Sequence, residues 1–153
     1  MTRHALDSWA VLRWREGAEP AASRVEAVLP DRPVMSWLNV GEVAYVIARL
    51  EGPEVAHQVV RDLEALLELD HATPTRVLQA ASIKATHPMA IADAFAAATA
   101  LAHDAVLLTG DPELLDAGGP WQQEDLRSVE RPAGDAPARR GQSADLGNGG
   151  GGR

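Results

Sequence analysis

The 153-residue sequence contains no cysteine, and it has only one phenylalanine and one tyrosine. The lack of cysteine excludes disulfide bonds, thiolate metal sites and a cysteine nucleophile. Hydrophobic residues nevertheless make up 46% of the chain, which is enough apolar side chain to offset the entropy of ordering a domain. Because these residues are mostly alanine, valine and leucine, we expect helices packed closely on a sheet.

The sequence also lacks an uninterrupted apolar run of the ~18 to 20 residues that cross a membrane. Its first residues lack the basic segment and apolar run of a secretory signal. We therefore expect a soluble, cytoplasmic protein with no membrane partner. The length suits one domain with one hydrophobic core.

The formal net charge of −8 is distributed unevenly. Residues 131–153 hold four arginines and two aspartates, a net charge of +2, so residues 1–130 carry −10. An acidic body opposes nonspecific nucleic-acid binding by charge alone, and it favours cations or a basic partner. Residues 131–153 read RPAGDAPARRGQSADLGNGGGGR, which predicts a disordered tail after a domain of residues 1–130.

Within the domain, short strand-like runs alternate with longer helical ones. The predicted strands are residues 4–6, 34–37, 66–70 and 105–109, and the predicted helices are residues 9–15, 20–29, 40–51, 54–66, 74–86 and 90–103. Strands separated by helices of this length pair in parallel through right-handed crossovers. The expected fold is an α/β/α sandwich of three layers with a central, mostly parallel sheet. Ligands bind such sheets beyond the carboxyl ends of the strands.

Four acidic residues stand where the predicted strands end or where the next helices begin. They are Asp7, Glu42, Asp93 and Asp111. Two of them have simple structural explanations, since Asp7 precedes a helix that Ser8 caps and Asp111 caps the helix opened by Pro112.

The other two acids also have structural explanations. Glu42 stands three residues after Asn39, as in a capping box. Asp93 lies in the first turn of a helix, where a carboxylate stabilises the helix dipole. Its apolar neighbours predict a buried turn, and a buried carboxylate needs a positive group beside it.

The four acids together predict a metal site. The carboxyl ends of parallel strands converge at one edge of the sheet, so these carboxylates would repel one another unless some were protonated. A hard divalent cation removes this conflict, because Mg²⁺ prefers oxygen ligands and retains waters.

Four segments resemble the acidic motifs of a known family. They are HALDSWAVL (4–12), NVGEVAYVIARL (39–50), ATHPMAIADAFAAATAL (85–101) and AVLLTGDPELL (105–115). In this order and at these spacings they are similar to the motifs of PIN-domain ribonucleases, especially the VapC toxins of bacterial toxin–antitoxin pairs. The resemblance covers about residues 3–129.

The resemblance implies a metal-dependent endoribonuclease that uses Mg²⁺ or Mn²⁺, forms a homodimer and is inhibited by a small antitoxin bound near the active site. It implies that the catalytic and metal-binding residues are Asp7, Glu42, Asp93 and Asp111. It also implies that Thr109 lines the site and that Ser8 supports Asp7. The chain departs from the family pattern at Ala90, where a serine cap often begins the helix, and this loss weakens the helix start by about 1 kcal/mol.

In the mechanism so implied, Asp7, Glu42 and Asp93 hold the metal directly or through waters. Asp111 completes the cluster, either by orienting a water or by binding a second ion. A water bound to Mg²⁺ attacks the RNA phosphodiester in line and leaves a 5′-phosphate and a 3′-hydroxyl. The sequence does not identify the RNA, the cleavage site or the antitoxin.

Other functions fit the sequence less well. A phosphatase of the haloacid-dehalogenase type needs an aspartate where Trp9 stands, and a phosphorelay receiver needs a lysine late in the domain, whereas the only lysine is Lys84. The alternative we retain is a catalytically silent PIN-like module that binds RNA or a protein partner.

The sequence leaves the roles of several aromatic and basic residues undecided. Trp9 and Trp37 would stack RNA bases or pack in the core. Arg13, Arg76 and Lys84 are candidate contacts for phosphate, and the sequence does not choose among them. The five histidines show no metal-ligand spacing.

Overall fold

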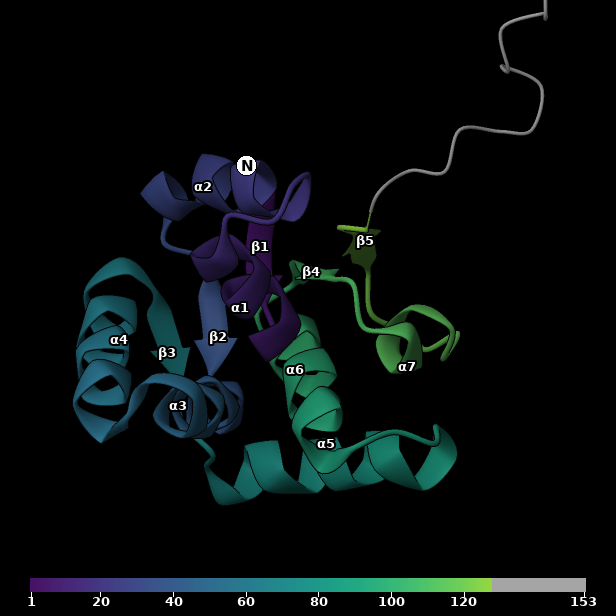
Figure 1. The fold of residues 1–153 in the computed structure, drawn as a ribbon. Helices are drawn as coiled ribbons and strands as arrows, with labels where there is room; N and C mark the ends of the chain where they lie inside the picture. The colour runs from purple at the N-terminus through teal and green to yellow at the C-terminus, as the bar shows by residue number, and fades with distance from the viewer. Residues whose placement is uncertain (128–153) are drawn as a thin grey trace, which may run out of the picture.

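The structure, a computed structural model, describes residues 1–127 (Figure 1). The strands are β1 (Arg3–Leu6), β2 (Val34–Ser36), β3 (Glu68–Asp70), β4 (Ala105–Thr109) and β5 (Gln123–Asp125). The helices are α1 (Ser8–Glu16), α2 (Ala21–Val28), the 3₁₀ turn η1 (Leu29–Asp31), α3 (Trp37–Glu51), α4 (Pro53–Leu66), α5 (Pro74–Thr86), α6 (Ile91–Ala102) and α7 (Pro112–Leu115). The predicted domain end at 130 and the predicted tail of 131–153 lie outside the described residues.

The five strands form one sheet in the order β3-β2-β1-β4-β5, and every pairing is parallel. The expected parallel sheet is therefore confirmed. The sequence predicts four of these strands and misses β5, whose three residues Gln-Glu-Asp are all polar. β5 pairs with β4 at the sheet edge, where a strand needs few apolar residues.

Helices cover both faces of the sheet, which confirms the three-layer α/β/α architecture (Figure 1). Successive side chains of β1 point to opposite faces, so Leu6 packs with α1 to α4 and Ala5 packs with α5 and α6. Both side chains are buried. Two neighbouring residues of this central strand thus contribute to two hydrophobic clusters.

Helix α6 confirms the alanine-rich helix predicted from the sequence. Every residue from Ala92 to Ala100 is buried. Alanine has the highest helix propensity and a short side chain, so this helix lies close to the sheet as well as to α5. Its first turn reaches the carboxyl edge of the sheet, where it carries Asp93.

Helix α3 begins three residues earlier than the sequence predicts. Its N-cap is Ser36, whose hydroxyl accepts the Leu38 N–H at 3.2 Å. Asn39 therefore lies inside the helix, and the capping box proposed for Asn39 and Glu42 is wrong. The sequence places Trp37 in the preceding strand, whereas β2 ends at Ser36 and Trp37 begins α3.

None of the helices in residues 1–127 has the length and apolar character needed to span a membrane.

Candidate active site

The four predicted acids come together at the carboxyl edge of the sheet. Asp7 directly follows β1 and Asp111 lies two residues after β4, while Glu42 and Asp93 lie near the starts of α3 and α6. The negative charges of Asp111 and Glu42 raise the pKa of both Asp7 and Asp93. Charges act in this way only when the groups are close.

Asp7 is buried and serves as the N-cap of α1. Its Oδ1 accepts the Ala10 N–H at 2.8 Å, and its Oδ2 accepts the hydroxyl of Thr109. Burial raises the pKa of Asp7 from 3.8 to about 7, although these two hydrogen bonds lower it. The cap of α1 is thus Asp7 itself, and not Ser8 as the sequence suggests.

Thr109 connects the acids of two neighbouring strands. Its hydroxyl donates to Asp7 and accepts the backbone N–H of Asp111 at 3.0 Å. The side chain is buried at the last position of β4. A valine would fill the same space without either bond, so the hydroxyl has a specific role in joining Asp7 to the Asp111 turn.

Glu42 is held by two side chains of other residues. Its Oε1 accepts the Ser8 hydroxyl at 2.8 Å and the Asn39 amide at 3.2 Å. Ser8 therefore contacts Glu42, where the sequence suggests Asp7 as its partner.

Asn39 is a site residue whose role the sequence does not reveal. It is fully buried, and its Nδ2 also donates to the carbonyl of Ala92 at 3.1 Å. It thereby joins α3 to the first turn of α6. Its Oδ1 is buried without a hydrogen-bond partner among the residues that the structure describes.

Asp93 is buried among carboxylates. Burial raises the pKa of Asp93 to about 8, and the charges of Asp111, Asp7 and Glu42 contribute, together with a hydrogen bond to Glu113. A carboxyl group in such surroundings is protonated at neutral pH unless a cation joins it.

Glu113 is the second residue that sequence reasoning missed. Carboxylate oxygens of Asp93, Asp111 and Glu113 all lie within 4.8 Å of one another. Asp111 caps α7, as the sequence predicts, by accepting the Glu113 N–H at 2.9 Å. In the sequence, Glu113 is visible only as a second acid, two residues after Asp111. Its contact with Asp93 joins positions 20 residues apart and depends on how α7 packs on α6.

The basic candidates have partners outside the acidic cluster. Arg13 pairs with Glu16 at 2.7 Å and lies over the Trp9 indole, 5.3 Å from the ring centroid. Arg76 pairs with Asp70 at 2.7 Å. Among them, only Lys84 acts on this region, since its charge lowers the pKa of Glu113.

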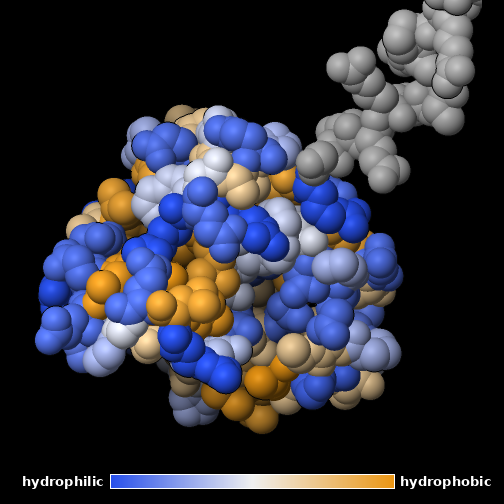
Figure 2. Space-filling model, in the orientation of Figure 1, coloured by the Kyte–Doolittle hydropathy of each residue, from blue (hydrophilic) through white to orange (hydrophobic). Residues whose placement is uncertain are grey.

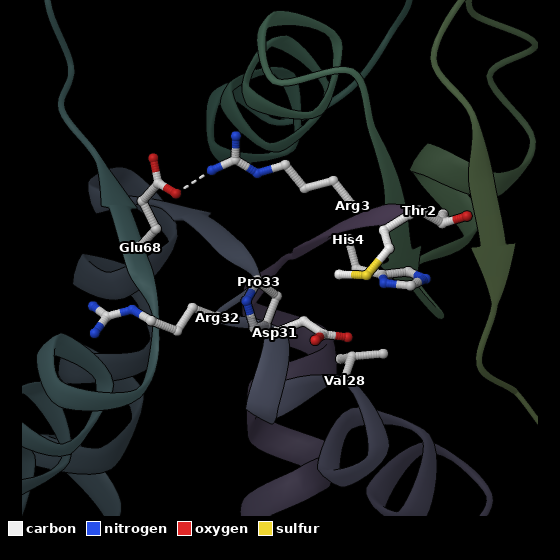
Figure 3. A pocket seen from close by; sticks show the side chains of 9 residues that line it. Thr2, Arg3, His4, Val28, Asp31, Arg32, Pro33 and Glu68 are labelled. Atoms are coloured by element: carbon white, nitrogen blue, oxygen red, sulfur yellow. Dashed lines mark hydrogen bonds and ion pairs between the residues drawn. The ribbon is translucent and has the colours of Figure 1, made fainter.

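A pocket of about 460 Å³ opens at the opposite edge of the sheet (Figure 3). Its lining comes from Met1, Thr2, Arg3, His4, Val28, Asp31, Arg32, Pro33 and Glu68. Figure 3 shows Arg3 extending across it to pair with Glu68. The pocket has none of the four acids, and it lies at the amino ends of β1 and β2.

A family model described as the PIN domain matches residues 6–120. The chain belongs to the PIN-domain family. The matched span includes all four acids, and no curated protein matches the chain.

Solved structures share this PIN fold at low sequence identity. The DNA-bound VapBC of Salmonella typhimurium is 20% identical with a TM-score of 0.67, over 83% of this chain and 100% of that one. A toxin–antitoxin complex from Klebsiella pneumoniae is 17% identical with a TM-score of 0.62, over 76% and 92%. VapC20 of Mycobacterium tuberculosis, described as a sarcin–ricin loop cleaving toxin, is 20% identical with a TM-score of 0.62, over 74% and 93%.

Proposed function

We propose that this PIN domain is a divalent-cation-dependent endoribonuclease and the toxin of a toxin–antitoxin pair. The observation that carries the proposal is the burial of Asp7 and Asp93 beside other carboxylates: burial first, and the charges of the neighbouring acids second, raise the pKa of both into the neutral range. The family match and the solved structures of VapC and VapBC proteins support it.

The side chains fit a hard cation. The donor atoms at this edge of the sheet are carboxylate oxygens. Neither a thiolate sulfur nor a histidine nitrogen is among them. Such donor sets suit Mg²⁺ or Mn²⁺. A cation also removes the cost of ionising Asp7 and Asp93, which burial and repulsion impose on the protein alone.

The roles we propose for the residues are those that the resemblance to PIN-domain ribonucleases implies. Asp7, Glu42 and Asp93 would hold the cation, and Asp111 would complete the cluster beside them. When bound, the cation supplies a Lewis acid that lowers the pKa of water and stabilises charge on the phosphate. Thr109 fixes the orientation of Asp7, and Ser8 with Asn39 fixes that of Glu42.

RNA is the proposed substrate, and in-line hydrolysis without the 2′-hydroxyl would leave a 5′-phosphate and a 3′-hydroxyl. The acidic edge repels a phosphodiester unless the cation neutralises it. Cleavage should therefore require both the cation and the intact cluster.

An RNase assay tests this function with the wild type, Asp93→Asn and Asp104→Asn. Asp104 is an exposed acid at the far end of the α6 region, so its amide variant is a matched control. We expect the wild type and the control to cut RNA with Mg²⁺ or Mn²⁺ and not with a chelator, while Asp93→Asn cuts at least about 100-fold more slowly. Equal cleavage by all three proteins, or no cleavage with any divalent cation, would overturn the proposal.

The proposed partners are a second copy of the chain and a small antitoxin. Figure 2 shows hydrophobic side chains gathered on a face that is otherwise mostly polar. The exposed large hydrophobic side chains include Tyr45 and Leu50 of α3 and Val77 and Leu78 of α5. Light scattering after gel filtration tests the dimer. Growth arrest on expression of the wild type, and not of Asp93→Asn, tests the role as a toxin.

A further inference from the structure

The peptide bond between Met89 and Ala90 is held on both sides by charged side chains. Lys84 of α5 donates its Nζ to the Met89 carbonyl at 2.5 Å. Glu113 of α7 accepts the Ala90 N–H on its Oε2 at 3.0 Å. The two side chains carry opposite charges, and each binds one polar group of the same peptide.

This peptide immediately precedes α6, a helix with no side-chain cap of its own. Its N-cap residue is Ala90, and alanine offers no oxygen to the backbone N–H groups of the first turn. In a capping box, the acid three residues after the N-cap accepts the N–H of the N-cap residue. In α6 that residue is Asp93.

Glu113 makes the bond that Asp93 would otherwise make. Because the Ala90 N–H is bound by an acid from another helix, the Asp93 carboxylate is not drawn back to its own backbone. It remains directed at the cluster, where one of its oxygens lies within 4.8 Å of carboxylate oxygens of Asp111 and Glu113. The buried side chain of Met89 anchors the same peptide in the core.

We propose that Lys84 and Glu113 are positioning residues that clamp the Met89–Ala90 peptide and so hold Asp93 in the active site. The consequence for RNA cleavage rests on the proposed function, but the consequence for the start of α6 does not. The clamp also assigns a role to Lys84, the only lysine of the sequence.

Another role for Glu113 makes a different prediction. Its carboxylate lies within 4.8 Å of those of Asp93 and Asp111, so it is placed where a metal ligand would be. A ligand requires the negative charge, whereas the clamp requires only an oxygen that accepts a hydrogen bond. Glu113→Gln retains the acceptor and removes the charge, and Glu113→Ala removes both.

Hydrogen exchange of the amides of residues 90–94, measured by mass spectrometry in chelator, tests the clamp without metal or RNA. We expect exchange to rise roughly 5- to 10-fold in Glu113→Ala, as for the loss of a helix cap. Lys84→Met should also raise it, while Glu113→Gln and Lys84→Arg should stay within about twofold of the wild type. Glu64→Ala, an exposed glutamate of α4, is the matched control and should change nothing.

A second-site variant separates the clamp from a general loss of structure. Ala90→Ser supplies the side-chain cap that α6 lacks. Combined with Glu113→Ala, it should return the exchange of residues 91–94 toward the wild-type rate.

Cleavage of RNA with Mg²⁺ gives the functional readout for the same variants. We expect Glu113→Ala to lower kcat about 10-fold, Glu113→Gln to retain it within about twofold, and Ala90→Ser to recover much of the loss in the double variant. Unchanged exchange in Glu113→Ala overturns the clamp. The clamp is also overturned if Glu113→Gln keeps the wild-type rate of hydrogen exchange but no longer cleaves RNA. The negative charge of Glu113 would then be the property that cleavage requires. If the wild type cuts no RNA, the proposed function fails while the exchange experiment still decides the clamp.

Discussion

Replacing Asp7 by asparagine should make the metal-free protein more stable at pH 8 and not at pH 4. Asp7 is buried at the end of β1, and its pKa is raised from 3.8 to about 7. The folded state therefore binds the Asp7 proton more tightly than the unfolded state does. The stability that comes from this proton is fully present below about pH 4, and it is lost as the pH rises through about 7.

The size of the effect follows from the two pKa values. One pKa unit corresponds to about 1.4 kcal/mol, so ionising Asp7 in the folded protein costs at most about 4 kcal/mol of the free energy of unfolding. The asparagine of the variant cannot ionise, so the variant does not lose this free energy of unfolding as the pH rises. It also caps α1 as well as aspartate does, and the Thr109 hydroxyl can rotate to accept the amide that replaces Oδ2.

The assay is urea denaturation of the wild type and Asp7→Asn between pH 4 and pH 8 in chelator. The difference in free energy of unfolding should be small at pH 4 and should favour the variant by up to about 4 kcal/mol at pH 8. Saturating Mg²⁺ should stabilise the wild type and reduce the difference in free energy of unfolding between the two proteins. A difference in free energy of unfolding that does not change with pH would refute the claim that ionising the buried Asp7 destabilises the folded protein.

Three further substitutions test the contacts around the cluster. Thr109→Val should lower the free energy of unfolding by about 1 to 3 kcal/mol, because the Asp111 N–H loses its acceptor, while Thr109→Ser should restore it in the same denaturation assay. Gly110→Ala should destabilise the protein by about 1 to 3 kcal/mol and shift the tryptophan emission, because its Cβ would overlap the Trp9 indole; an unchanged melting curve would contradict this. Asn39→Leu should slow RNA cleavage by releasing Glu42, and it should lower the free energy of unfolding by about 1 to 3 kcal/mol, because Glu42 and the Ala92 carbonyl both lose their Nδ2 donor.

The features that the sequence predicts are those set by neighbours along the chain. β4 is a continuous apolar run and α6 is rich in alanine, so propensity and hydrophobicity agree on both. The acids Asp7 and Asp111 follow strands directly, and a parallel sheet carries every such position to one edge. The grouping of Asp7 and Asp111 therefore follows from the sequence alone.

The features that the sequence does not predict depend on contacts between distant elements. At the start of α3 the N-cap is Ser36, whereas the sequence pattern points to Asn39. β5 has no apolar pattern, and it forms because β4 offers it an edge. The bond from Glu113 to Ala90 joins residues 23 apart, so local rules assign Glu113 only to its own short helix.

The acids of the cluster are held in two different ways, which determines how the site responds to substitution. Asp7 and Asp111 are N-caps, so each gives one carboxylate oxygen to its own helix and keeps its position through the backbone. Glu42 and Asp93 lie inside their helices, and other side chains direct them: Ser8 and Asn39 for the first, Glu113 for the second. Removing these supports should disturb Glu42 or Asp93 and spare the two caps. The side chains most sensitive to distant substitutions are therefore the two that their own helices do not fix.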